Sequence, residues 1–292
     1  MNTKIRFSII DTFVIAGIAL ACIYFSYRIS AGLNYNWNWA AIPQFLFRYD
    51  SSRDIWVPNL LMQGLFTTIR LSIWGILLAT LLGIIMGFCR TSNSLFKRLL
   101  GGTYVELIRN TPPLVLIFIF YYFFSSQIIP ATGLENLIQE SGRGGRIISL
   151  LFSPPSNLPV FLSAVITLGI FEGAYITEII RSGIQSIEKG QWEASYTLGF
   201  TRYQQFRHII FPQALRRILP PLAGQFISTI KDSAIVSVIS VQELTFQGME
   251  IMASTYLTFE IWITVAVMYL VLSFVFSMLS SQLEVYFRRS MA

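Results

Sequence analysis

The sequence predicts an all-α membrane protein with about six transmembrane helices. Of its 292 residues, 54% are hydrophobic and only 12% are charged, whereas average protein composition is roughly 25% charged. The mean hydropathy is +0.60. Apolar stretches long enough to cross about 30 Å of hydrocarbon as helices recur along the chain. We place six of them near residues 10–27, 60–88, 103–125, 159–180, 217–239 and 258–284.

The first apolar stretch allows two interpretations. Lys4 and Arg6 precede it, and it ends near the small residues 30–32, which is the pattern of a cleaved signal peptide. Tyr27 and Arg28 make a poor cleavage site, so we favour a retained anchor helix.

An aromatic segment follows the first stretch. Residues 34–39 read Asn-Tyr-Asn-Trp-Asn-Trp, and tryptophan and tyrosine favour the headgroup region of a bilayer. We expect residues 30–58 to lie on the outer leaflet, with docking of a receptor protein as the alternative. The first domain is therefore residues 1–58, a transmembrane helix with a periplasmic interfacial segment.

Glycine marks the second stretch and the connection after the third. Gly75, Gly83 and Gly87 are small residues that let neighbouring helices approach closely. Residues 127–159 are rich in glycine and proline and are typical of an irregular outer loop.

Proline marks the fifth stretch. Pro220, Pro221 and Gly224 should break its first turns, and Lys231-Asp232 lies beyond them. A broken helix is tolerated in lipid only where protein buries the freed backbone groups or where they line a cavity. We therefore expect this stretch to face the protein interior or a pathway.

The basic residues predict the orientation, because Lys and Arg accumulate in the cytoplasmic loops of inserted helices. With the N-terminus inside, the connections carry fourteen Lys and Arg inside against five outside, so both termini are expected in the cytoplasm, with a short tail at 288–292. The net charge of +6 is explained by this topology and requires no nucleic-acid partner. The inside residues are Lys4, Arg6, Arg90, Lys97, Arg98, Arg109, Arg181, Lys189, Arg202, Arg207, Arg216, Arg217, Arg288 and Arg289.

A polar loop at 181–216 separates the fourth and fifth stretches. Gly190 can serve as an N-cap with Glu193 three residues later, and Gly199 can supply the left-handed residue that ends a first short helix. Thr201 with Gln204 matches a capping box, which predicts a second helix from about residue 202 to a stop near Pro212.

The first loop helix displays an unusual amount of apolar surface. Trp192, Tyr196 and Leu198 stand beside its charges. Two interpretations remain open: these side chains pack into a soluble partner, or they fold back onto the membrane domain.

Two ionisable residues, Arg70 and Glu172, fall near the middle of the bilayer. An unpaired charge there costs at least a few kcal/mol, so both should face the interior. We hypothesise that they lie on a substrate pathway, where an arginine suits a carboxylate and a glutamate suits an ammonium group. The alternative is a structural Arg70–Glu172 pair. Lys231 and Asp232 are further pathway candidates.

The sequence gives little support to catalysis or metal binding. His208 is the only histidine, and no nucleophile and base set or metal-binding motif is present. Cys22 and Cys89 lie in different apolar stretches at different depths, which supports neither a disulfide nor a metal site. We expect no catalytic residues and no metal in this chain.

The loop resembles a known family. Glu193-Ala194-Ser195, then Gly199, Ile209 and Pro212, resembles the EAA loop of ABC importer membrane subunits, with Ser for the second Ala. Flanking motifs resemble the polar amino acid permeases of the histidine, glutamine and glutamate type. They are Arg109-Asn110-Thr111-Pro112, Tyr175, Glu178, Arg181, Gly183, Gln191, Gln213-Ala214-Leu215-Arg216, Pro220-Pro221 and Lys231-Asp232-Ser233.

The resemblance covers residues 59–287 and implies a type I ABC importer-like core of five helices, to which the first helix is an added anchor. It implies that the loop inserts into a groove on a cytoplasmic ABC ATPase subunit and couples its closure to the helices. The coupling residues would be Gly190, Trp192, Glu193, Ala194, Tyr196 and Gly199.

The partners also follow from the resemblance. They are cytoplasmic ATPases, a second permease that is identical or paralogous, a periplasmic or lipid-anchored amino acid-binding protein, and membrane lipid. The sequence has no G-x-x-x-x-G-K-[ST] motif, so ATP hydrolysis must come from the partner. We expect no cofactor in this chain, because ATP and magnesium would bind to the ATPase.

The expected function is that of a multi-pass permease subunit of an amino acid importer in a bacterial inner membrane. Asp232-Ser233-Ala234 and the outer aromatic segment favour an acidic or broad range of amino acids, whereas Glu172 would suit a cationic one. The alternative class is a stand-alone secondary transporter or channel for a small polar solute, which would need no ATP. A membrane-embedded enzyme is disfavoured.

Overall fold

The computed structural model describes residues 9–32, 35–128 and 151–290, so most of the predicted outer loop at 127–159 lies outside the described residues. The chain divides into two compact units, residues 1–39 and 40–292, whereas the sequence places its first boundary after residue 58. Each unit is described by itself.

The first unit contains a single apolar helix, α1 (Ile9–Gly32). Its 24 residues correspond to about 36 Å of helix. Its sequence is mostly apolar along its whole length, as expected of a helix that crosses lipid. After it, the rings of Trp37 and Trp39 stack with their centroids 5.8 Å apart.

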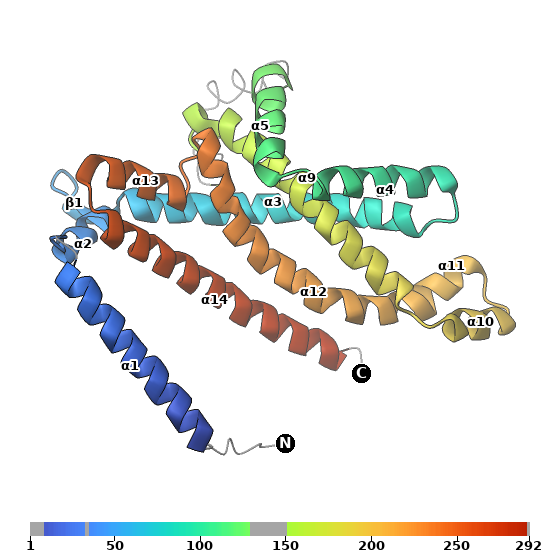
Figure 1. The fold of residues 1–292 in the computed structure, drawn as a ribbon. Helices are drawn as coiled ribbons and strands as arrows, with labels where there is room; N and C mark the ends of the chain where they lie inside the picture. The colour runs from blue at the N-terminus through green and yellow to red at the C-terminus, as the bar shows by residue number, and fades with distance from the viewer. Residues whose placement is uncertain (1–8, 33–34, 129–150, 291–292) are drawn as a thin grey trace. The chain divides into compact units, whose positions relative to one another are not determined.

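The second unit contains four helices that are long and apolar enough to cross a membrane, counted over the described residues: Leu60–Thr91, Leu158–Gln185, Arg202–Ile239 and Thr258–Gln282. Figure 1 labels all of its main elements except β2; they are α2 (Ile42–Leu46), β1 (Phe47–Asp50), β2 (Ile55–Pro58), α3 (Leu60–Thr91), α4 (Leu95–Arg109), α5 (Pro113–Phe123), α9 (Leu158–Gln185), α10 (Lys189–Thr197), α11 (Arg202–Gln204), α12 (Phe211–Asp232), α13 (Leu244–Thr255) and α14 (Thr258–Ser290). Short helical segments at Trp39–Ala41, Phe124–Ile128, Pro155–Asn157, Gln205–Ile210 and Ser233–Ile239 complete the order.

A two-stranded antiparallel hairpin precedes α3. Tyr49 lies opposite Trp56 in the β1–β2 register, with ring centroids 5.5 Å apart. In the turn, the backbone N–H and the hydroxyl of Ser52 donate to Asp50 over 3.0 and 2.6 Å. These bonds hold the pKa of the Asp50 carboxyl below its usual value.

Helices α3 and α9 form the centre of the second unit. Leu168 lies against Gly75, Ile176 against Gly83 and Ile180 against Gly87. Because the contacts advance together along both helices, α3 and α9 run parallel. A Cβ at Gly83 would stand 2.7 Å from the Cβ of Ile176, so glycine at this position permits the close approach.

The third apolar stretch is two helices rather than the single span predicted at 103–125. α4 ends at Arg109 and α5 begins at Pro113. Pro112 disfavours a helical conformation for the residue before it, which ends the first helix. α4 folds back along α3, with Gly101 against Arg90, and Arg109 stacks over the Tyr175 ring at 5.2 Å.

The prediction that Pro220 and Pro221 break the fifth stretch is wrong. α12 continues through both of them. A proline deprives the carbonyl four residues earlier of its donor, and here those carbonyls belong to Arg216 and Arg217, both exposed. The regular helix changes instead at Ser233, where a tighter 3₁₀ segment runs to Ile239.

Pro212 does not end the second loop helix either, in contrast to the prediction. The chain is helical from Arg202 onward, and a π-helical segment at Gln205–Ile210 leads directly into α12. Pro212 lies in the first turn of α12. The wider π turn changes the hydrogen-bond register just where the proline would otherwise remove a donor.

Candidate functional site

The loop between α9 and α12 begins with the short helix α10. Its N-cap is Glu188, and Gly190 lies inside the first turn. The predicted capping role of Gly190 is therefore wrong. Glycine has no side chain with which to cap, so the prediction rested only on its spacing to Glu193, and both the N-cap and the start of the helix lie two residues earlier than predicted.

Gly199 ends α10 as predicted. Its φ is +80°, in the left-handed region. The Gly199 N–H donates to the Tyr196 carbonyl over 2.9 Å, and the Phe200 N–H donates to the Ser195 carbonyl over 3.3 Å. This pair of bonds is the Schellman motif, which closes the helix with a fixed geometry.

The predicted capping box opens the next helix. The Gln204 N–H donates to the Thr201 hydroxyl over 3.4 Å, and the Thr201 N–H donates to the Gln204 side chain over 2.9 Å. The loop is thus a short helix, a glycine elbow and a second capped helix.

The two faces of α10 have different surroundings. Trp192 packs against Ile187 and Ile210 in the core shared with α9 and α12, and Ser195 is 2% exposed. Tyr196 is 76% exposed and Leu198 74%. Trp192 therefore folds back onto the membrane domain, whereas for Tyr196 and Leu198 contact with a soluble partner stays a prediction.

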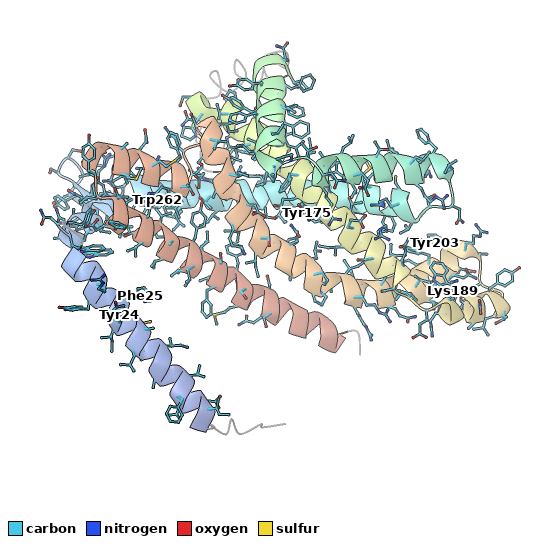
Figure 2. The ribbon with its side chains drawn as sticks, in the orientation of Figure 1. Tyr24, Phe25, Tyr175, Lys189, Tyr203 and Trp262 are labelled. Atoms are coloured by element: carbon cyan, nitrogen blue, oxygen red, sulfur yellow. The ribbon has the colours of Figure 1, made fainter. Side chains whose placement is uncertain are left out.

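Glu193, Ala194 and Tyr203 extend the exposed face of the loop. Figure 2 shows Tyr203 and Lys189 projecting at this end of the second unit. Tyr203 is 74% exposed. An open surface with three large apolar side chains on a rigid support is suited to contact with another protein.

Polar contacts join the loop to the long helices. Arg217 donates to the Ser186 carbonyl, and Gln213 donates to Gln191 over 3.1 Å. Nearby, Glu178 of α9 binds Arg90 of α3 and, over 2.8 Å, Arg181. The sequence analysis did not assign these links; Glu178 and Arg181 are neighbours on one helix, but the other three join residues that only the fold brings together.

A polar cluster that contains the buried Glu172 and the exposed Asp232 lies where α9 meets α12. Glu172 is fully buried and accepts a hydrogen bond from Gln225, and the Asp232 carboxyl is close enough to interact with it. Its Oε1 atom has no hydrogen-bond partner within the described part of the chain. Lys231, next to Asp232, is exposed. The structure thus brings together three of the four predicted pathway residues.

Arg70 lies apart from this cluster. Because Gly75 is level with Leu168 and Gly83 with Ile176, Glu172 is level with Ala79, about nine residues or 14 Å along α3 from Arg70. Arg70 donates instead to the Phe66 carbonyl over 3.2 Å. The alternative of a structural Arg70–Glu172 pair is therefore wrong.

A second buried carboxylate, Glu243, was not predicted from the sequence. It accepts hydrogen bonds from the Thr245 and Phe246 N–H groups, both over 2.8 Å, and from the Tyr269 hydroxyl over 2.7 Å. The sequence feature that could have indicated Glu243 is its position as a possible N-cap directly before an apolar helical stretch. No group of three or more metal-binding side chains occurs among the described residues.

A helical protein with several membrane-crossing stretches, buried carboxylates within them and a stiff capped loop at one end is built as the membrane component of a transporter. Residues 79–289 match the family described as the binding-protein-dependent transport system inner membrane component. The chain belongs to this family, the multi-pass inner-membrane permeases of ABC importers.

Individual relatives agree with this assignment. The chain is 35% identical over 225 residues to the glutamine transport system permease protein GlnP of Escherichia coli (strain K12), covering 77% of this chain and 91% of that protein. It is 35% identical over 226 residues to the L-cystine transport system permease protein TcyB of Bacillus subtilis (strain 168), covering 77% and 85%. It is 32% identical over 216 residues to the glutamate/aspartate import permease protein GltJ of Escherichia coli (strain K12), covering 74% and 80%.

Solved structures share the fold. The crystal structure of an amino acid ABC transporter with histidines has a TM-score of 0.64 and 30% sequence identity, covering 86% of this chain and 99% of that one. An inward-facing structure of the MetNI methionine ABC transporter has a TM-score of 0.59 at 16% identity, covering 80% and 96%, which shows the fold alone.

Proposed function

We propose that this chain is the permease subunit of an ATP-driven importer of polar amino acids and that α10 couples it to a separate ATPase. The observation that carries the coupling proposal is the division of α10 into an anchored face and an open face. Tyr196 and Leu198 are exposed while Trp192 and Ser195 pack inward. A partner that binds the open face can therefore move the helices behind it.

Rigidity supports this role. The Schellman end at Gly199 and the capping box at Thr201 fix the geometry of the loop. Arg217 bonded to Ser186 and Arg90 bonded to Glu178 then connect the loop to α12, α9 and α3. A displacement at α10 would be transmitted through these contacts as a movement of packed helices.

The substrate proposal rests on the carboxylate cluster. Glu172 and Asp232 can neutralise the ammonium group that every amino acid carries, and exposed Lys231 can meet a carboxylate. We propose an acidic or broad range of polar amino acids. The printed names of the relatives, which are glutamine, L-cystine and glutamate/aspartate permeases, support this range.

The assembly would contain two permeases, two ATPases that bind ATP and magnesium, and an extracytoplasmic binding protein. Both termini and the loop would face the cytoplasm. In this arrangement the parallel helices α3 and α9 start at the outer surface and end at the ATPases.

Uptake into proteoliposomes tests this function. The chain is reconstituted with its ATPase and candidate binding proteins, and uptake of labelled glutamate, glutamine and arginine is measured with and without internal ATP. We expect uptake that requires ATP and the binding protein. Uptake driven by an ion gradient alone would instead establish a stand-alone transporter and refute the proposal.

A charge variant tests the pathway in the same assay. Glu172→Gln should lower uptake strongly, because it removes the carboxyl group that is proposed to meet the ammonium group. Glu106→Gln is the matched control, since Glu106 is exposed and bonds Asn110 over 2.9 Å. Equal uptake by the two variants would exclude Glu172 from the pathway.

A further inference from the structure

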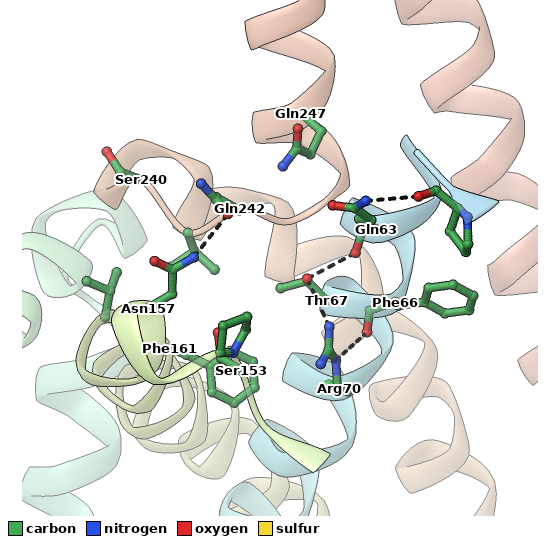
Figure 3. A pocket seen from close by; sticks show the side chains of 14 residues that line it. Gln63, Phe66, Thr67, Arg70, Ser153, Asn157, Phe161, Ser240, Gln242 and Gln247 are labelled. Carbon is green, nitrogen blue, oxygen red and sulfur yellow. Dashed lines mark hydrogen bonds between the residues drawn. The ribbon is translucent and has the colours of Figure 1, made fainter. Parts of the chain in front are cut away.

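A cavity of about 360 Å³ opens at the N-terminal ends of α3 and α9 (Figure 3). The first turns of α3, the residues leading into α9, and the connection between residue 239 and α13 form its walls. Cavities of about 300 Å³ and above hold small molecules. The cavity lies at the opposite end of α3 and α9 from α10.

The lining of this cavity is polar with one charged group among the described residues. Arg70 supplies the charge, and the amides of Gln63, Asn157, Gln242 and Gln247 surround it. Phe161, 1% exposed, belongs to the apolar part of the wall. Figure 3 shows Gln242, Gln247 and Arg70 arranged around the space from three different segments.

The hydrogen bonding of this lining is incomplete. Gln247 is 4% exposed, yet its Oε1 atom finds no partner among the described residues. Leaving a buried acceptor unbonded is costly, and such groups usually find a ligand or water.

We infer that this cavity is an outer subsite for a free amino acid, which it holds before the substrate reaches Glu172 and Asp232. Arg70 would bind the α-carboxylate as a charge-assisted pair. The Gln247 Oε1 atom would accept from the ammonium group, and the other amides would meet a polar side chain. This inference rests on the proposed function, which puts this end of α3 outside.

The charge of the lining gives the subsite a preference. With a guanidinium and no carboxylate among the described lining residues, it attracts anionic and neutral polar amino acids and repels cationic ones. The outer subsite and the deeper carboxylate cluster therefore select opposite ends of the same molecule.

Protection of an introduced thiol tests the subsite in the full chain held in lipid nanodiscs. Ser240, an exposed residue of the cavity wall, is changed to Cys in a background that carries Cys22→Ser and Cys89→Ser. Free glutamine or glutamate should slow labelling at position 240, and arginine should not. Glutaminamide, which lacks the carboxylate, should also give no protection.

Two lining variants and one control identify the residues responsible. Arg70→Gln should weaken protection by glutamine about 10- to 100-fold in concentration, the factor expected for a lost hydrogen bond to a charged group. Gln247→Met should weaken it independently. Arg53→Gln is the matched control, because Arg53 lies on the hairpin with a side chain 75% exposed. Unchanged basal labelling shows that each variant is folded.

Three results would overturn the inference: no protection by free amino acids, protection that Arg70→Gln leaves unchanged, or protection only when an unliganded binding protein is added. The last would assign the bound carboxylate to a side chain of the docking protein. The assay uses neither ATP nor the ATPase, so it gives its answer even if ATP-dependent uptake is absent.

Discussion

Glu243 is a fully buried carboxylate that holds the start of α13 to two long helices. Besides the two N–H groups of α13, it binds the Tyr269 hydroxyl of α14, and the Thr68 hydroxyl of α3 lies 3.4 Å away. Thr68 in turn accepts from the Leu244 N–H over 3.1 Å. This arrangement satisfies a buried charge with donors from three elements.

Glu243→Gln is expected to destabilise the protein. The amide places its own N–H₂ group among donors that need an acceptor, at a cost of about 1–3 kcal/mol. Thermal unfolding in detergent should show a lower midpoint. Glu250→Gln, an exposed position of the same helix, is the control. Identical midpoints for both variants would show that Glu243 does not hold these helices together.

Gly199→Val is expected to leave the protein inserted but to uncouple ATP hydrolysis from uptake. No atom lies within 4 Å of a Cβ at Gly199, so the effect comes only from its φ of +80°. A left-handed residue with a side chain costs roughly 1–2 kcal/mol, and a β-branched one resists this conformation further. We expect the number of molecules taken up per ATP to fall several-fold.

Gly102→Val is the control for this uncoupling, because Gly102 also faces open space but has no positive φ. It should keep the uptake per ATP of the parent chain. If Gly199→Val took up as many molecules per ATP as the parent chain, the left-handed turn at Gly199 would have no role in coupling.

Local chemistry explains which residues could be predicted from the sequence. Gly199 and the Thr201–Gln204 box act through neighbours within a few positions, so their spacing was sufficient. The proximity of Glu172 to Asp232 depends on how α9 packs on α12, which no spacing encodes. That Arg70 and Glu172 do not pair with each other depends likewise on the offset between α3 and α9.

At the scale of elements, the α3–α9 contact depends on residues without side chains. Gly75, Gly83 and Gly87 of α3 admit side chains of α9, and Gly169 of α9 admits Leu78 in return. Without a strong hydrophobic drive between helices in lipid, such close packing is a main source of association.

Gly83→Ala is expected to lower the thermal midpoint, because a Cβ there would overlap Ile176. Overpacking of this kind costs about 1–3 kcal/mol. The double variant with Ile176→Ala should recover part of the loss, since it removes the overlapping atoms. Gly17→Ala in α1, where nothing lies within 4 Å, should have no effect. Additive losses in the double variant would contradict direct contact.

The prolines show where prediction of elements failed. Pro112 ends a helix, whereas Pro212, Pro220 and Pro221 are accommodated within one. Proline removes a donor wherever it occurs, but whether the helix ends depends on the freed carbonyls and on the local register. Solvent exposure decides whether the freed carbonyls can bond water, and the π turn at 205–210 and the packing of the helix set the register. The sequence alone shows neither.

At the scale of the whole molecule, the apolar stretches predicted the fold class and the family resemblance predicted the architecture. The family assignment at 79–289 confirms the resemblance. The division at residue 40 was not foreseen. Ile42 packs with Leu61 and Leu244 in one core, so α2, which precedes the hairpin, belongs structurally to the helices that follow it.

A chain that begins at Ala40 is expected to insert, to assemble with the ATPase and to transport at the rate of the full chain. The deleted part contributes no residue to the described cores of the second unit. Membrane fractionation and the uptake assay measure the two properties. A properly inserted but inactive truncated chain would show that α1 takes part in transport.

The parallel, glycine-lined contact between α3 and α9 has a mechanical consequence. Two helices whose side chains interlock along so many turns cannot slide past one another. They must therefore translate and tilt together as one rigid body. The cavity lined by Arg70 lies at one end of this helix pair, and the Arg90–Glu178 ion pair lies at the other. A displacement of the loop would therefore tilt both helices and move the walls of the distant cavity at the same time. No stepwise rearrangement of the residues in between would be needed.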